Sequence, residues 1–334
     1  MSIKHRLLPI GLMLLVLLSS SFKLKNDPPW QKETKNKSLK ILVISDLNAS
    51  YGSTTYPAEI AQVVERIATI KPDLILCGGD MVAGQKASLT DENIKAMWQN
   101  FDASVLKPIQ QMQIPFGFTL GNHDASPSFV RERAIAKAFW LDDANQTGLT
   151  FVDSSHFPFY FSYLKNNVFI MSWDAAASKV NPEVYTWMKA QLKSKVAKKA
   201  RLRMLIGHLP LYAIVAAKNK PGEVNADADQ TLQFFKDNGL NLYISGHQHA
   251  YFPAQKNGVQ LLNLGAIGDG PRPILGHSAP AQKAYTVFEV PIKQPKKLDF
   301  MTYQPATDLP ILINSLPESV TGFNGTIKRV DQKN

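Results

Sequence analysis

Short apolar runs alternate with amphipathic segments along most of the chain. Runs rich in Val, Ile and Leu, such as "SLKILVIS" (residues 38–45), predict buried strands. Segments with apolar residues three or four positions apart, such as "YPAEIAQVVERIATIK" (residues 56–71), predict helices. Strands are expected in residues 38–45, 72–80, 114–124, 157–174 (as a hairpin), 202–208, 240–249, 259–268 and 284–292, and helices in residues 56–71, 90–101, 127–140, 181–200 and 227–239. This alternation predicts one α/β domain over residues 38–303.

The first residues of the chain have a different pattern. A short basic start precedes an apolar run over residues 7–18, which is short for a membrane span. This layout is typical of a secretory signal peptide in residues 1–21, and an uncleaved membrane anchor is the alternative. The protein is therefore expected to be secreted or periplasmic, or else anchored in a membrane and facing outside. Residues 22–37 are interpreted as a lysine-rich tether.

Composition narrows the class of protein. With 334 residues, 45% of them hydrophobic, the chain can bury one large core. The single cysteine, Cys77, lies in an apolar run and is expected to be a buried, inert thiol. Much of the net charge of +10 lies in the tether and in residues 189–203. No aromatic residues are interleaved with the charges of residues 189–203, so a nucleic-acid partner is disfavoured. Residues 304–334 form a C-terminal extension whose pattern is ambiguous.

Five of the predicted strands end in polar residues that can bind metal ions. The residues are Asp46, Asp80, Asn122 with His123, His208, and His247 with His249. Each is weak evidence alone, because an Asp after a strand often caps a turn and a Gly-His pair is common in surface turns. Histidines two positions apart on an extended chain converge only if the chain bends. Ligands gather at the carboxyl ends of strands in α/β sheets, so together these residues predict one binding site.

The ordered set of motifs resembles the calcineurin-like metallophosphoesterases. That family has D-x-H (or D-x-G), G-D, G-N-H-[DE], H and G-H-x-H in this order. This chain has Asp46, "GD" at 79–80, "GNHD" at 121–124, "GH" at 207–208 and "GHQH" at 246–249. The segments "HLPLY" and "YTWMKAQL" are also similar to the family. The resemblance implies a layered fold of two packed mixed β-sheets flanked by helices. It also implies two divalent or trivalent metal ions, from among Mn, Fe, Zn and Mg.

The resemblance also implies a role for each motif residue. Asp80 would bridge the two ions, with Asp46 and His249 on one and the remaining ligands, Asn122, His208 and His247, on the other. His123 would protonate the leaving group, although it could instead only orient Asn122. Asp124 would support His123 by accepting a hydrogen bond from it.

The chain departs from the family pattern in the first motif. Asn48 stands where a histidine ligand is usual, and Ala83 stands where the purple acid phosphatases have a ligating tyrosine. The affected metal site is therefore expected to be weakened or retuned. As a ligand, the amide oxygen of Asn48 would suit harder ions such as Mn or Mg. Alternatively, Asn48 only caps the turn.

The predicted function is hydrolysis of small phosphate mono- or diesters by a hydroxide bound to the metals. A non-catalytic metal- or phosphate-binding protein of the same fold and a nuclease are the alternatives. Membrane contact is expected only through an uncleaved N-terminus, and the pattern indicates no oligomeric state. Candidates for binding the rest of the substrate are the hydroxyl-rich loop residues Tyr51, Ser53, Thr54, Thr55 and Tyr56, together with Tyr251 and Arg272.

Overall fold

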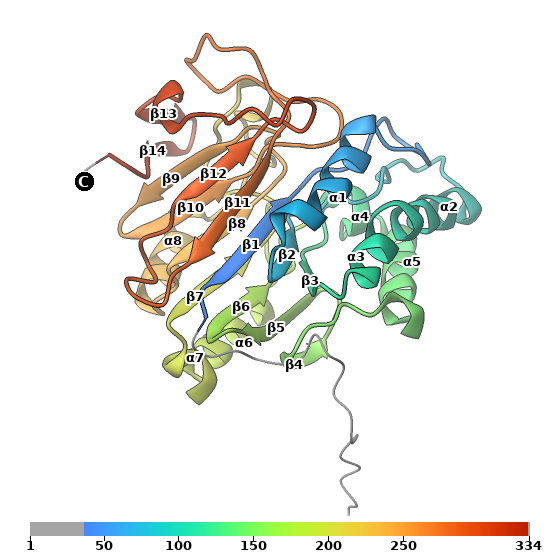
Figure 1. Cartoon of the computed structure of the whole chain (residues 1–334), viewed down its shortest axis with the longest axis horizontal. Helices are drawn as coiled ribbons and strands as arrows, with labels where there is room; N and C mark the ends of the chain where they lie inside the picture. The colour runs from blue at the N-terminus through green and yellow to red at the C-terminus, as the bar shows by residue number, and fades with distance from the viewer. Residues whose placement is uncertain (1–36, 333–334) are drawn as a thin grey trace, which may run out of the picture.

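Two β-sheets packed face to face form the centre of the molecule, shown by a computed structural model that describes residues 37–332 (Figure 1). The first sheet has the order β12-β11-β1-β2-β3 and comprises β1 (Leu39–Ile44), β2 (Leu74–Cys77), β3 (Phe116–Phe118), β11 (Tyr285–Val290) and β12 (Phe300–Tyr303). The second has the order β13-β14-β9-β10-β8-β7-β6-β5-β4 and comprises β4 (Phe151–His156), β5 (Tyr160–Lys165), β6 (Val168–Ser172), β7 (Leu202–Ile206), β8 (Leu242–Ser245), β9 (Phe252–Lys256), β10 (Val259–Asn263), β13 (Ser319–Gly322) and β14 (Gly325–Arg329).

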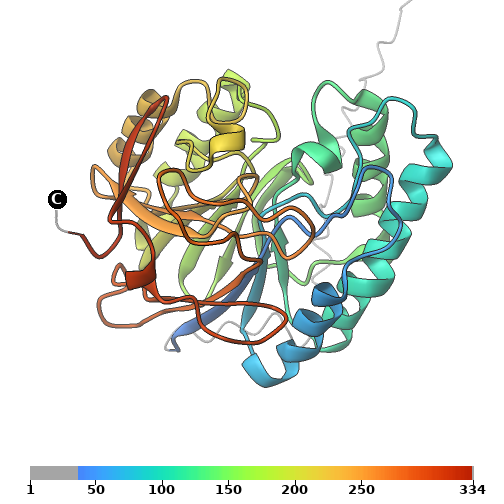
Figure 2. The same cartoon turned by 90° about the horizontal axis from the view of Figure 1, so that it is seen from above.

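Helices cover the outer face of each sheet (Figure 2). One group comprises α1 (Ala58–Ile70), α2 (Asp91–Phe101), α3 (Lys107–Gln111), α4 (Asn122–Ala125) and α5 (Val130–Leu141), and the other comprises α6 (Pro182–Lys193), α7 (Lys195–Lys199) and α8 (Ala228–Asp237). The first sheet has the parallel strands β1-β2-β3 at one side and the antiparallel β11 and β12 at the other. The second has a parallel centre, β6-β7-β8-β10, with antiparallel strands on both sides. The predicted fold of two mixed sheets flanked by helices is therefore confirmed.

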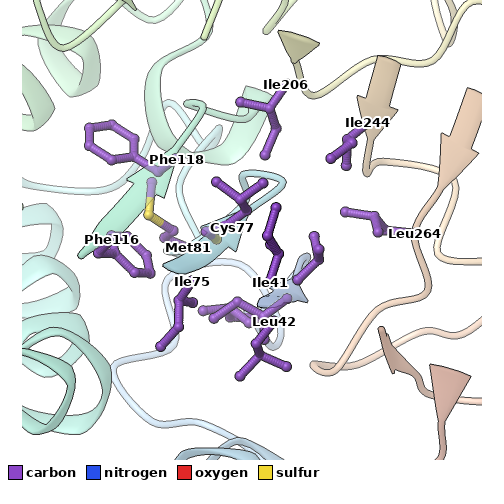
Figure 3. Close-up of a cluster of buried hydrophobic side chains, with 14 of the residues drawn as sticks. Ile41, Leu42, Ile75, Cys77, Met81, Phe116, Phe118, Ile206, Ile244 and Leu264 are labelled. Atoms are coloured by element: carbon purple, nitrogen blue, oxygen red, sulfur yellow. The ribbon is translucent and has the colours of Figure 1, made fainter. Parts of the chain in front are cut away.

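The apolar core between the sheets explains why the central strands lack polar alternation. Ile41 and Cys77 of the first sheet and Ile206 and Ile244 of the second belong to one buried cluster (Figure 3). All four residues of β2 are buried, because the second sheet covers one face of β2 and helices cover the other, and the same cluster includes Ile60 of α1 and Trp98 of α2. Cys77 is a free, buried cysteine, as expected, and burial raises the pKa of its thiol.

Local capping explains where several helices begin and end. Helix α2 begins after Thr90, whose hydroxyl accepts a hydrogen bond from the Asn93 backbone N–H at 3.2 Å. The helix predicted over residues 181–200 breaks at Ser194, which adopts an extended conformation and caps α7 instead. Gly239 follows α8 with a φ of +69°, as a helix-ending glycine does.

The sequence pattern did not predict five of the strands, which are β4, β9, β12, β13 and β14. Strand β4 is largely exposed, and β9 contains Pro253, so neither has the apolar run of a central strand. In the C-terminal extension, β14 pairs with β9 through Lys328 opposite Gln255, and β13 pairs with β14. The ambiguous tail thus lengthens the second sheet.

The N-terminal predictions fall outside the described part of the chain. The signal peptide or anchor lies wholly there, and so does the tether except for Lys37. Within residues 37–332, no helix is both long and apolar enough to cross a bilayer.

Candidate metal centre

The site lies where the parallel strands of both sheets end. Strand β1 leads into Asp46, β2 into Asp80 and β3 into Asn122, while β7 leads into His208 and β8 into His247 and His249. All six side chains are buried. The carboxyl ends of strands from two packed sheets therefore bring together residues that are up to about 200 positions apart in the chain, as the His247 N–H to Asp46 Oδ1 hydrogen bond of 3.1 Å shows.

Left-handed backbone turns direct four of these side chains into the site. Asp46, Asp80, His247 and His249 have φ values of +50°, +53°, +68° and +54°. This conformation is uncommon for residues other than glycine, and it tends to persist where the surrounding structure holds it for function. It is also the bend that lets two histidines separated by one residue point toward a common centre.

The residues form two groups that share Asp80. Ligand atoms of Asp46, Asp80 and His249, here called the first group, lie within 4.8 Å of one another, as do those of Asp80, His208 and His247. Asn122 joins the latter three as the second group. Its Oδ1 is 2.9 Å from both His208 Nε2 and His247 Nδ1. The residues thus fall into the same two groups that the family resemblance implies, and their role as metal ligands stays a prediction.

Each histidine of the two groups has an outward ring nitrogen bound to an acceptor. The pairs are His208 Nδ1 with Gly78 O at 2.8 Å, His249 Nδ1 with Gly270 O at 2.9 Å, and His247 Nε2 with Glu223 Oε2 at 2.8 Å. Carbonyl and carboxylate oxygens only accept, so the ring nitrogen in each pair carries the proton. In the neutral ring, the other nitrogen then points its lone pair into the site.

The inward lone pairs meet oxygen atoms that are acceptors too. His208 Nε2 and His247 Nδ1 face Asn122 Oδ1, and His249 Nε2 lies 3.2 Å from Asp46 Oδ1. Two facing acceptors repel each other unless a positive charge lies between them. A proton or a metal ion can supply this charge, and converging imidazole nitrogens and carboxylate oxygens are a donor set for divalent metals. The residues present therefore fit metal ions in both groups.

The pKa shifts also indicate that the site favours a positive charge beside Asp80. Burial opposes ionisation of Asp80, but His208 and His123 outweigh it and hold the pKa of this carboxyl well below its usual range. Burial would lower the pKa of His208, yet the charge and hydrogen bond of Asp80 raise it to about 9. Burial lowers the pKa of His247 to about 3, so that ring is neutral at physiological pH. A metal ion would displace the proton of His208.

His123 lies beside the groups and is more exposed than their histidines. Its Nδ1 donates to Gly84 O at 3.0 Å, and its Nε2 lies 4.0 Å from Asp80 Oδ2. The ring of Tyr51, whose surface is 56% exposed, lies 5.0 Å from the His123 ring. His123 therefore holds one nitrogen fixed and presents the other at the mouth of the site.

Asp124 does not make the hydrogen bond expected from the sequence. Its two oxygens accept from the backbone N–H groups of Val82 and Gly121, at 2.9 and 2.8 Å. Burial and the nearby Asp80 carboxylate raise the pKa of Asp124 to about 7. The expected His123–Asp124 pairing is therefore wrong, because the turn that starts α4 uses this carboxylate to tie two loops together.

The departures from the family pattern lie next to the first group. Asn48 is 7% exposed, and its backbone N–H bonds Asp80 O at 3.3 Å. This backbone bond fits the turn-forming role, and ligation by the side chain of Asn48 stays a prediction. Ala83 is buried, and its carbonyl accepts from the Gly52 N–H at 2.7 Å.

At least three of the six proposed substrate-binding hydroxyls form hydrogen bonds within the fold. Tyr56 donates to Met81 O at 2.6 Å, and buried Tyr251 donates to Phe300 O at 3.3 Å, so both are occupied within the fold. The Ser53 hydroxyl bonds within its own loop. Arg272 approaches the site through its backbone N–H, which bonds His249 O at 3.1 Å.

Three residues at the site had no signal in the sequence pattern. Gln85 accepts from Asn122 Nδ2 at 2.7 Å and thereby turns Asn122 Oδ1 inward. Glu223 and Lys218 contact His247 from the loop after β7. All three lie in loops without motif spacing, so only the fold brings them to the site. Gln248, as expected, points away and accepts from Ile214 N–H at 3.1 Å.

Comparison with known proteins agrees with this geometry. The family model described as "Calcineurin-like phosphoesterase" matches residues 39–251, more than half of the chain. The chain belongs to the calcineurin-like phosphoesterase family. It is 25% identical to purple acid phosphatase 17 of Arabidopsis thaliana over 243 residues, which cover 69% of this chain and 68% of that protein. Members of this phosphoesterase family use divalent metals, which the two Asp/His groups could hold.

Two solved structures share the phosphoesterase fold. The purple acid phosphatase PPD1 from yellow lupin seeds matches with a TM-score of 0.61 at 12% identity, covering 83% of this chain and 53% of that one. This chain thus spans about half the length of the lupin enzyme. GAP50 of Plasmodium, described as the anchor in the inner membrane complex, matches with a TM-score of 0.56 at 14% identity, covering 89% of this chain and 90% of that one.

Proposed function

We propose that this protein is a metal-dependent hydrolase of small phosphate esters and that it carries two metal ions, one in each group. The observation that carries the proposal is the set of inward lone pairs and carboxylate oxygens around Asp80, which require positive charge. The donor set contains no sulfur, so Mn, Fe, Zn or Mg fits it better than a thiolate-preferring ion. The substrate class is a small anionic ester, which the net charge of +10 attracts.

The metals, when bound, would lower the pKa of water and act as Lewis acids on the phosphoryl oxygens. The chain's own residues would orient the reactants. Asp46 and His249 would bind the metal ion on one side of Asp80. Asn122, His208 and His247 would bind the ion on the other side. The Gly84 carbonyl fixes a proton on His123 Nδ1, so Nε2 is the nitrogen that would carry and pass a second proton to the leaving oxygen. This nitrogen lies 4.0 Å from Asp80 Oδ2, beside both groups.

Hydrolysis assays on the purified full chain test this function. We would add Mn, Zn, Fe or Mg to metal-stripped protein and measure turnover of a chromogenic phosphomonoester beside a phosphodiester. Glu289→Gln removes an exposed carboxylate on β11 and serves as the control for Asp80→Asn. Metal-dependent turnover in the wild type and in Glu289→Gln, lost in Asp80→Asn, supports the proposal. The better substrate assigns monoester or diester specificity.

A non-catalytic binding protein is the second candidate. The Plasmodium relative is described as an anchor, so the fold alone does not imply turnover. Full metal occupancy without hydrolysis of any ester, under any of the four metals, would favour this candidate.

Export is part of the proposal and rests on the pattern of residues 1–21. Cell fractionation with N-terminal sequencing of the mature chain tests it. A mature N-terminus near residue 22 outside the cytoplasm supports cleavage, whereas a retained start in the membrane fraction supports the anchor.

A further inference from the structure

A charged pair from the loop after β7 contacts the second group. Glu223 Oε2 lies 2.8 Å from His247 Nε2. Lys218 Nζ lies 3.4 Å from the same carboxylate oxygen, and 3.1 and 3.2 Å from His247 Nε2 and Nδ1. The Lys218 side chain is only 14% exposed, so its charge is held at the site and does not extend freely into solvent.

Glu223 decides which nitrogen of His247 is available. Its carboxylate accepts the proton on Nε2, which leaves the lone pair on Nδ1, 2.9 Å from Asn122 Oδ1. The same carboxylate oxygen lies 3.4 Å from Lys218 Nζ, so Glu223 holds both the imidazole and the ammonium.

Lys218 places a positive charge against both nitrogens of this ring. An ammonium has three donors and no acceptor, and it lies 3.2 Å from His247 Nδ1, whose lone pair faces Asn122 Oδ1. A metal ion in the second group needs that same lone pair. Lys218 and the metal ion therefore repel each other across a few ångströms. The Arg272 guanidinium adds to the positive field at Lys218.

An anion on the metal would turn this repulsion into attraction. A tetrahedral oxyanion bound in the second group would place oxygens next to both cations, and an ammonium-to-phosphate hydrogen bond is charge-assisted. Because coupling free energies are reciprocal, an anion that binds better with the metal present also makes the metal bind better. Lys218 can provide this coupling because its Nζ lies 3.2 Å from His247 Nδ1, beside the second group.

We propose that Lys218, held by Glu223, is a phosphate-binding residue that couples oxyanion binding to metal occupancy in the second group. This inference rests on the proposed function, since it takes the second group to be a metal site. The ligand class is an inorganic or esterified phosphate.

Calorimetric titration of the full chain tests the inference without turnover. We would measure Mn²⁺ binding with and without inorganic phosphate, and phosphate binding to the Mn-loaded protein, for the wild type, Lys218→Met and Lys218→Arg. Lys220→Met is the matched control, because Lys220 is an exposed lysine two residues away in the same loop.

Removing Lys218 should weaken phosphate binding without weakening Mn²⁺ binding. In Lys218→Met, the Kd for phosphate should rise about tenfold to a hundredfold, as expected for losing a hydrogen bond to a charged group. The Kd for the second Mn²⁺ without phosphate should stay the same or fall, because a repelling charge is gone. Lys218→Arg should restore most of the phosphate affinity, and Lys220→Met should match the wild type.

Two results would overturn the inference. One is a phosphate Kd in Lys218→Met within twofold of the wild type; the other is a loss of Mn²⁺ affinity in that variant, which would make Lys218 a structural support of the metal site. If the wild type bound both metals and phosphate normally in either case, the proposed function would survive. A wild type that binds no Mn²⁺ would overturn both.

Discussion

The two ligand groups on either side of Asp80 are built differently. The first group offers two carboxylates and one imidazole, and the outward nitrogen of His249 bonds only a backbone carbonyl, Gly270 O. The second group offers one carboxylate, an amide oxygen and two imidazoles, and His247 is held by the charged side chain of Glu223. Carboxylate-rich sites favour harder ions and imidazole-rich sites favour borderline ones. We expect the two ions to differ in affinity, and an affinity difference can be tested one group at a time.

Removing the shared carboxylate should have the largest effect. Asp80→Asn takes the only ligand common to both groups and leaves the facing acceptors without the charge that attracts metal ions. We expect loss of both metals at micromolar concentration and a fall in hydrolysis of about 10³-fold or more. Elemental analysis and turnover check this. Retention of one tightly bound metal would show that the groups do not depend on a common residue.

His123 should separate catalysis from metal binding. His123→Ala removes the proton carrier at the mouth but no member of either group. We expect turnover to fall about 10²- to 10⁴-fold with metal content unchanged. The fall should be smaller for esters of acidic phenols, whose leaving groups need no proton. An equal fall for acidic and non-acidic leaving groups would assign His123 to positioning.

Replacing Glu223 should lower the metal affinity of the second group alone. Glu223→Leu frees the Nε2 proton of His247 from its acceptor, so the ring can adopt the other tautomer or turn away from the site. We expect a loss of about 10- to 100-fold in affinity for one of the two metals. Glu223→Gln keeps an acceptor oxygen and should lose less. Metal titrations of both variants check this prediction. A loss of affinity for both metals together would contradict the difference between the two groups.

Replacing Asn48 should cause the smallest change in metal affinity, and only in the first group. Asn48→His introduces the imidazole that the family pattern has at this position. We expect about tenfold tighter binding of Zn or Fe by one metal site, with the second group unchanged. Asn48→Ala measures whether the amide oxygen ligates. Unchanged metal affinity in Asn48→Ala would assign Asn48 to the turn alone.

The sequence predicted that the candidate ligands meet at one site because each follows a predicted strand, whereas their division into two groups came from the family resemblance. Strand ends are local features, so Asp80 and His247 could be placed at one sheet edge before the fold was known. Glu223 and Lys218 could not, because a loop residue reaches the site only through the path of its loop. Asp124 was assigned the wrong partner because its sequence neighbour His123 turns toward Gly84 instead.

The same distinction between local and distant contacts applies to the fold. Helix α2 and its cap at Thr90 are local and were predicted. Strand β9 was missed because Pro253 interrupts its pattern, and it forms only by pairing with β10 and β14. The hairpin of β13 and β14 likewise depends on the edge that β9 provides.

Metal stoichiometry in single-group variants tests the central claim most directly. We would load the full chain with Mn²⁺ and count bound ions by equilibrium dialysis for the wild type, His249→Ala and His208→Ala. If two groups share Asp80, the wild type binds two ions, and each variant keeps one tight ion and loses the other. A wild type that binds one ion, or variants that both lose the same ion, would contradict the claim.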